Sequence, residues 1–72
     1  MSSYTAIIKG VVSKVTGIPQ DKLGEDTVIP VEHHMDVLMR TTIETGAAML
    51  FHERRGLTIG KITEEVDRFY AR

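Results

Sequence analysis

Residues 4–15 read Tyr-Thr-Ala-Ile-Ile-Lys-Gly-Val-Val-Ser-Lys-Val. The apolar side chains of this stretch recur at steps of three, one, three, one and three residues: Tyr4, Ile7, Ile8, Val11, Val12 and Val15. This spacing follows the α-helical turn of about 3.6 residues, so these side chains share one face. Ser2 or Ser3 is expected to cap the helix, and Gly17 supplies the left-handed residue that ends it. The stretch therefore predicts an amphipathic helix.

Residues 18–30 lack this periodicity. Pro19, Gly24 and Pro30, with polar residues between them, predict a long ordered loop. A loop of this length inside a compact domain needs apolar anchors. We expect the anchors to be Ile18, Leu23, Val28 and Ile29.

A second helix is predicted to begin between Pro30 and Met35 and to run to about Arg54. Steps of three and four give it an expected core face made of Met35, Leu38, Met39, Thr42, Ile43, Gly46, Ala47 and Leu50. A glycine inside a helix is unfavourable, so Gly46 indicates a close approach of another backbone. Gly56 is expected to end the helix.

A third helix is predicted from Thr58, its expected cap. Its apolar face is formed by Ile59, Ile62, Val66, Phe69 and Tyr70. Three helices and one long first loop within 72 residues predict one all-α domain over residues 1–72, built as a small helical bundle.

Composition excludes several classes of function. Nine Lys and Arg residues against ten Asp and Glu give a net charge of −1, which provides no basic field for nucleic acid or an anionic membrane. There are no cysteines, which excludes disulfides, thiolate metal sites and thiol nucleophiles. No apolar run reaches the roughly 20 residues that span a bilayer, and the amino terminus lacks signal-peptide features. We expect a cytoplasmic protein.

The best candidates for metal ligands are His33, His34, Asp36 and His52. Adjacent histidines point in different directions on a helix, and His33 with Asp36 supplies too few ligands for zinc, which takes three or four. No nucleophile, phosphate loop or oxyanion motif accompanies them. The sequence therefore predicts no catalytic residue, no metal site and no cofactor.

Residues 7–26 read IIKGVVSKVTGIPQDKLGED, and this stretch resembles the first helix and loop of acyl and peptidyl carrier proteins. In that family the first helix ends in a glycine followed by an apolar residue, and an acidic segment leads to an apolar anchor, matched here by Val28 or Ile29. The motif Asp-Ser-Leu then opens the second helix. Counting onward without a gap places residues 36–38, Asp-Val-Leu, on that motif, and the last helix is also similar.

The departures from the family determine what the resemblance implies. Val37 occupies the position of the serine that receives phosphopantetheine, and an isopropyl group has no oxygen to phosphorylate. His34 stands where the family usually has glycine, and the family's short third helix is expected to be reduced or absent. Its second helix is acidic and docks partner enzymes, whereas Arg40, Arg54 and Arg55 interrupt the acidic residues here.

The resemblance therefore implies a non-catalytic carrier-like domain that cannot be phosphopantetheinylated. It would act by contact with enzymes of acyl, polyketide or nonribosomal-peptide biosynthesis. One alternative is an unrelated helical adaptor or homodimerisation domain, with the apolar residues 47–51 as its interface. Another is an atypical carrier modified at Thr41 or another residue that is not serine.

Methionine-rich faces can serve as adaptable binding surfaces. Met35 and Met39 fall on the predicted core face, so we expect them to pack inside the domain, whereas Met49 and Phe51 fall outside it. The candidate interface residues are Asp36, Val37, Arg40, Met49, Phe51, Arg54 and Arg55.

Overall fold

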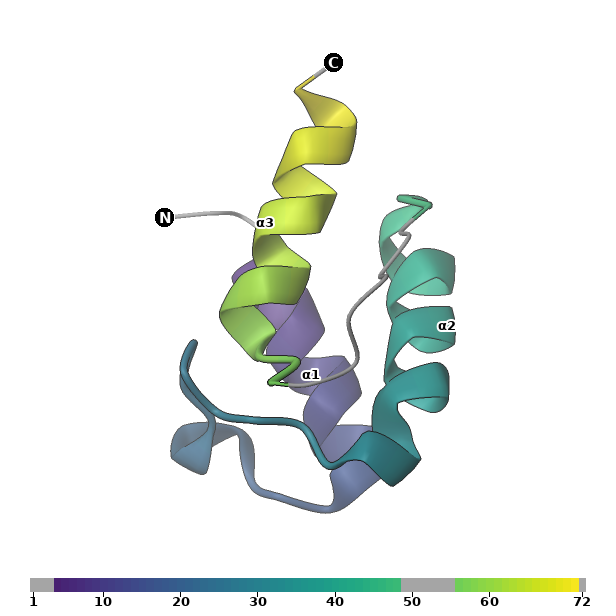
Figure 1. The fold of residues 1–72 in the computed structure, drawn as a ribbon. Helices are drawn as coiled ribbons and strands as arrows, with labels where there is room; N and C mark the ends of the chain where they lie inside the picture. Colours follow the sequence, from purple (N-terminus) through teal and green to yellow (C-terminus); the bar gives the residue numbers. More distant parts are fainter. Residues whose placement is uncertain (1–3, 49–55, 72) are drawn as a thin grey trace.

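The computed structural model describes residues 4–48 and 56–71, and these residues form three α-helices and no β-strand (Figure 1). The elements in chain order are α1 (Thr5–Thr16), η1 (Gln20–Lys22), η2 (Val31–His33), α2 (His34–Thr45) and α3 (Ile59–Tyr70), where η denotes a 3-10 helix. The prediction of a small all-α bundle is confirmed. The prediction about the family's short third helix falls largely on residues 49–55, which lie outside the described residues.

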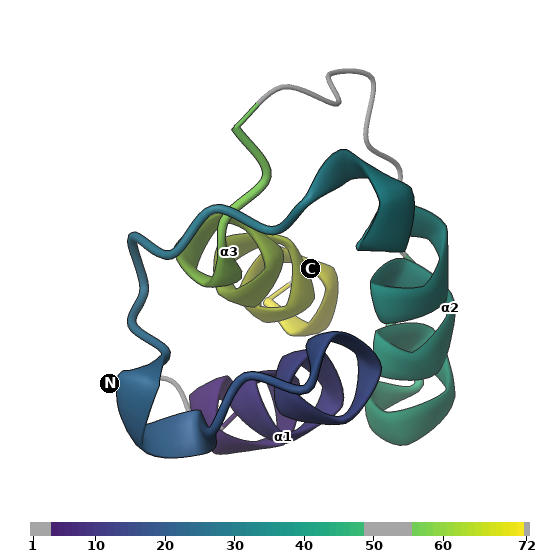
Figure 2. The same cartoon turned by 90° about the horizontal axis from the view of Figure 1, so that it is seen from below.

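Helix α1 packs against both α2 and α3, and Figure 2 shows it below α3 and beside α2. Most of its predicted face is confirmed, since Ile8, Val11 and Val12 are buried, whereas Ile7 is exposed. Gly17 ends the helix with φ +80°, and its N–H donates to the Ser13 carbonyl at 2.8 Å. The residue at the N-cap is Tyr4, which makes no side-chain cap bond, while residues 2–3 lie outside the described part.

The core is contributed by all three helices and by the segments that join them. Its buried apolar members are Ile8, Val11, Val12, Leu23, Ile29, Val37, Ala47, Leu57, Ile59, Ile62 and Val66. Full burial of one such aliphatic side chain contributes about 1.5–3 kcal/mol, so this cluster is the main stabilising element of the domain.

Two of the four predicted loop anchors, Leu23 and Ile29, are buried, and Ile18 is partly buried against the core. The prediction for Val28 is wrong, because its side chain is 59% exposed. Successive side chains of extended chain point to opposite sides, so an inward Ile29 turns Val28 outward. The loop is held against the segment before α3, where the Ile29 N–H donates to the Leu57 carbonyl at 2.8 Å.

Helix α2 ends at Thr45, so the prediction that it continues to about Arg54 is wrong. Gly46 takes the left-handed conformation with φ +76°, and its N–H donates to the Thr42 carbonyl at 2.8 Å. The apolar pattern continues past this point because Ala47, outside the helix, fills the core with 0% exposure. The group that approaches Gly46 closely is a side chain, since the Tyr70 hydroxyl would lie 3.0 Å from an added Cβ.

The core face predicted for the second helix is correct for Ala47, which is buried, and for Leu38, which is partly buried against the core, but it is wrong for three other members. The residues of α2 that are buried are His34, Val37 and Thr41, whereas Met35, Met39 and Ile43 are exposed. The helix carries apolar side chains on two faces, and the inward face includes two polar residues that the apolar pattern did not place in the core. Helix α3 begins as predicted, with Thr58 at the N-cap accepting from the Lys61 N–H at 3.2 Å, and its predicted face is buried except toward its end, where Tyr70 is exposed.

Candidate protein-interaction surface

Four apolar side chains at steps of four residues form an exposed row along η2 and α2, here called the α2 stripe. Its members are Val31, Met35, Met39 and Ile43, with exposed fractions of 70%, 62%, 56% and 73%. Side chains four residues apart lie above one another on a helix, so the three within α2 make a continuous ridge. Both views place α2 at the edge of the molecule, with α1 and α3 toward its inner side (Figures 1 and 2).

A row of charged residues runs beside the stripe. Asp36, Arg40 and Glu44 each follow a stripe residue in sequence, and all three are exposed. One residue advances about 100° around a helix, so this row flanks the stripe along one side. Its charges alternate in sign along the helix.

The stripe borders a shallow groove between α1 and α2. Ala6, Ile7, Gly10, Val11, Lys14 and Glu44 line an open hollow of about 280 Å³. A smaller hollow of about 100 Å³ lies alongside it and is lined by Val11, Lys14, Arg40, Ile43 and Glu44. Ile43 therefore belongs both to the stripe and to the groove, so the exposed apolar surface continues from α2 toward α1.

The structure places the predicted interface residues in different environments. Asp36 and Arg40 are exposed and flank the α2 stripe. Val37 is 0% exposed and belongs to the core, so its assignment to an interface is wrong. The other four, Met49, Phe51, Arg54 and Arg55, lie outside the described residues.

The sequence prediction missed the stripe, because it assigned Met35, Met39 and Ile43 to the core. The signal that could have found it is their constant step of four residues, which continues back to Val31. The buried positions of α2 follow steps of three and four. Because both patterns are helical, only the packing of α1 and α3 decides which of them faces inward.

Thr41, the alternative attachment residue, is 0% exposed. Its hydroxyl has no hydrogen-bond partner among the described residues. A phosphopantetheinyl transferase cannot reach an enclosed hydroxyl, so attachment at Thr41 is incompatible with this fold.

The two described histidines occupy different environments. His34 is buried with 5% exposure, and its Nε2 lies 2.7 Å from the Ile29 carbonyl oxygen, so Nε2–H is the donor. His33 is partly exposed, and His52 lies outside the described residues. Among residues 4–48 and 56–71, no group of three His, Asp or Glu side chains gathers as a metal site would require. The buried histidine instead ties the start of α2 to the end of the loop.

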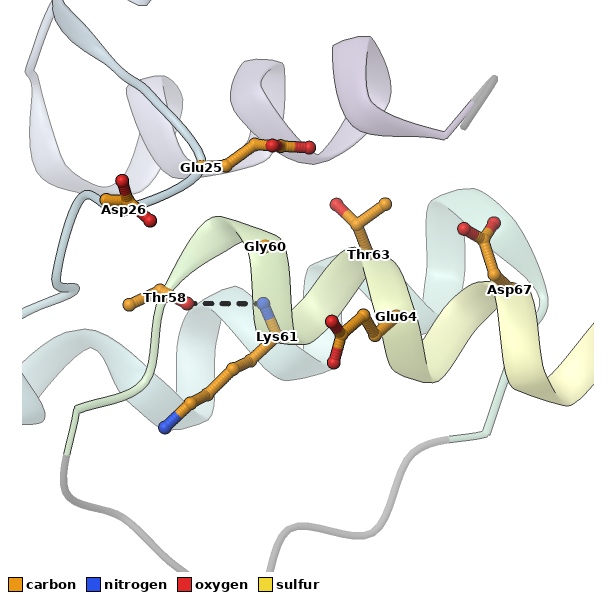
Figure 3. A pocket seen from close by; sticks show the side chains of 8 residues that line it. All are labelled: Glu25, Asp26, Thr58, Gly60, Lys61, Thr63, Glu64 and Asp67. Carbon is orange, nitrogen blue, oxygen red and sulfur yellow. Dashed lines mark hydrogen bonds between the residues drawn. The ribbon is translucent and has the colours of Figure 1, made fainter. Parts of the chain in front are cut away.

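A third hollow, of about 330 Å³, lies between the loop and α3 (Figure 3). It is lined by Glu25, Asp26, Thr58, Gly60, Lys61, Thr63, Glu64 and Asp67. Its four carboxylate residues are all exposed, and the Thr63 hydroxyl already donates to the Ile59 carbonyl at 2.9 Å. This face is a solvated acidic surface, in contrast to the exposed apolar stripe along α2.

Comparisons of the chain with protein-family models, with curated proteins and with solved structures gave no match. Within the described part of the chain, no helix combines the length and the apolar character that crossing a bilayer requires.

Proposed function

We propose that this chain is a non-catalytic, carrier-protein-like domain that acts through protein contacts made by the α2 stripe. The observation that carries the proposal is the row of four apolar side chains at steps of four, each more than half exposed. A contiguous exposed apolar patch is typical of a contact surface, whereas scattered exposed apolar residues are ordinary. Methionine at two of the four positions favours a surface that adapts to its partner.

The resemblance to carrier proteins suggests the class of partner. In that family the second helix is the element that docks enzymes, and α2 is the helix that bears the exposed stripe here. The position that matches the attachment serine is Val37, which offers no hydroxyl and is fully buried. We propose that the partners are enzymes of acyl, polyketide or nonribosomal-peptide biosynthesis, and that the domain occupies a docking site without delivering a substrate.

The proposal is tested with purified carrier-dependent enzymes encoded by genes neighbouring this one, each assayed with its own loaded carrier protein. The wild-type chain should inhibit competitively with respect to that carrier. Met39→Glu should remove the inhibition, because it places a charge in the middle of the apolar stripe and desolvating that charge opposes binding. The variant should keep the helical circular-dichroism spectrum of the wild type.

Val28→Glu is the matched control, since it makes the same chemical change at an apolar residue of similar exposure, 59% against 56%, away from α2. This control should inhibit as the wild type does. Equal inhibition by wild type and Met39→Glu would remove the stripe from the contact.

A further inference from the structure

We propose that a second copy of the chain binds the α2 stripe, with the two α2 helices antiparallel about a twofold axis at residue 38. The inference rests on the proposed function in one respect, that the stripe is a contact surface. A twofold interface joins the same patch of both copies, so it requires a patch that is complementary to itself. The spacing and the charges of α2 provide this complementarity.

The first requirement is that the apolar side chains interdigitate. With the axis at residue 38, Met39 of the first copy lies opposite position 37 of the second copy. It therefore fits between Met35 and Met39 of the second copy. Met35 likewise lies between Met39 and Ile43 of the second copy. Ridges of side chains four residues apart then fit into the gaps between equivalent ridges, as helix packing favours.

The second requirement is that the charges match. In an antiparallel pair the flank that carries Asp36, Arg40 and Glu44 meets the same flank of the second copy. With the axis at residue 38, Asp36 faces Arg40 of the second copy, and the symmetry repeats this pair. The register therefore aligns two opposite-charge pairs beside an interdigitated apolar seam.

Neighbouring registers are poorer. An axis at residue 40 places Arg40 opposite its own equivalent and Asp36 opposite Glu44, which brings like charges together. An axis at residue 42 pairs Arg40 with Glu44 but moves Met35 beyond Thr45, the end of the facing helix. Of these three registers, only the axis at residue 38 pairs opposite charges and also places every stripe residue opposite η2 or α2 of the second copy.

This register also has an unfavourable pair, which the symmetry repeats, because Glu44 faces position 32 of the second copy, which is also a glutamate. These residues lie six positions from the axis, about 9 Å along a helix at 1.5 Å per residue. Packed helices cross at an angle, so these two carboxylates lie farther apart than the paired groups nearer the axis. The Asp36–Arg40 pairs, two positions from the axis, determine the register.

The experiment uses complementary charge reversals and sedimentation equilibrium. The wild-type chain should form a dimer with rising concentration. Asp36→Lys should weaken the dimer at least tenfold, because the introduced ammonium would face the Arg40 guanidinium in both symmetry-related pairs. Arg40→Glu should weaken it similarly, because the introduced carboxylate would face the carboxylate of Asp36.

An equimolar mixture of Asp36→Lys and Arg40→Glu should recover dimers. Each mixed dimer contains one pair between the two introduced side chains, an ammonium and a carboxylate. It also contains one native pair, because the first variant keeps Arg40 and the second keeps Asp36. Both pairs are of opposite charge, whereas each variant alone brings like charges together.

Glu64→Lys on α3 is the matched control, because it makes the same kind of charge reversal at an exposed acidic residue away from α2. Its dimer should have the dissociation constant of the wild type within twofold, and circular dichroism should show that every variant is folded. A wild type that stays monomeric up to millimolar concentration overturns the inference. A mixture that does not recover dimers overturns it as well.

These failures differ from failure of the proposed function. The wild type could be monomeric and still inhibit the enzymes, while Met39→Glu does not inhibit them. That result would support enzyme docking and reject only the binding of a second copy. Alternatively, the wild type could form a dimer that Met39→Glu disrupts, while neither the wild type nor the variant inhibits any enzyme. That result would support self-association and reject enzyme docking.

Discussion

Val37 lies at the position where the resemblance to carrier proteins places the attachment serine, and its side chain is enclosed by the core with 0% exposure. A serine introduced there would replace apolar core contacts with a buried hydroxyl, which is unfavourable without a hydrogen-bond partner. It would also be enclosed in the folded state, so Val37→Ser would not restore attachment. Two properties of this position therefore oppose attachment, its chemistry and its burial.

A neighbouring residue, Thr41, provides a prediction about stability. Helical threonines commonly donate to the carbonyl four residues earlier, as Thr63 does to Ile59 and Thr45 does to Thr41. The Thr41 hydroxyl is fully buried and has no such partner within the described part of the chain. Thr41→Val keeps the side-chain shape and removes the unpartnered hydroxyl, so it should raise the free energy of unfolding by about 1 kcal/mol.

The measurement for Thr41→Val is chemical denaturation followed by circular dichroism, with Thr63→Val as the control. Thr63 is also buried, but its hydroxyl is bonded to the Ile59 carbonyl at 2.9 Å, so its loss should give no gain in stability. A lower stability for Thr41→Val would show that the hydroxyl has a partner, such as an enclosed water.

At the scale of the helix, the end of α2 depends on Gly46. Its φ of +76° is a conformation that costs a residue with a Cβ about 1 kcal/mol, and an added Cβ would also lie 3.0 Å from the Tyr70 hydroxyl. That hydroxyl donates to the Thr45 carbonyl, so it is not free to move away without losing a bond. Gly46→Ala should therefore lower the free energy of unfolding by about 2 kcal/mol.

Gly17→Ala is the matched control for this prediction. Gly17 ends α1 with a similar φ of +80°, but nothing lies within 4 Å of an added Cβ. Its substitution should show the backbone cost alone, about 1 kcal/mol. The difference between the two thermal or chemical unfolding curves measures the contact with Tyr70, and equal losses would mean that Tyr70 moves aside freely.

The helices also show what periodicity can establish. For α1 and α3 the apolar residues fall on one face, so the sequence predicted both the helix and most of its buried side, including the ends at Gly17 and Thr58, although Ile7 and Tyr70 are exposed. For α2 the apolar residues lie on two faces, and the inward one includes His34 and Thr41. A helical period alone does not say which of two apolar faces is covered.

The same ambiguity explains the partial prediction of the candidate site. The apolar pattern also runs past Gly46 without a break because Ala47 is buried outside the helix, so the pattern concealed the helix end. Asp36 and Arg40 were predicted as interface residues and are exposed, whereas Met35 and Met39 were assigned to the core through their apolar character. Their exposure depends on where α1 packs, which is a tertiary property.

At the scale of the whole molecule, the long loop closes the domain. It joins the segment before α3 through the bond from the Ile29 N–H to the Leu57 carbonyl at 2.8 Å, and the first turn of α3 through the bond from the Gly60 N–H to the Glu25 carbonyl at 2.9 Å. The Ile29 carbonyl accepts from His34 Nε2 at 2.7 Å. One residue thus connects the loop, the start of α2 and the segment that leads to α3, and its side chain is 1% exposed.

Ile29→Ala should therefore destabilise the whole domain and not the loop alone. Removing a large aliphatic side chain from a core costs about 2–5 kcal/mol. Domains of this size have a total stability of only several kcal/mol, so the variant should lose most of it and unfold cooperatively at a much lower denaturant concentration.

Val28→Ala is the control at the adjacent position, where the side chain is 59% exposed, and its effect should stay within about 0.5 kcal/mol. If the two variants unfold at the same denaturant concentration, the loop is not docked through Ile29. If Ile29→Ala increases amide hydrogen exchange only in residues 18–30 and leaves α1 and α3 protected, the loop opens as a separate unit and the helices hold the domain without it.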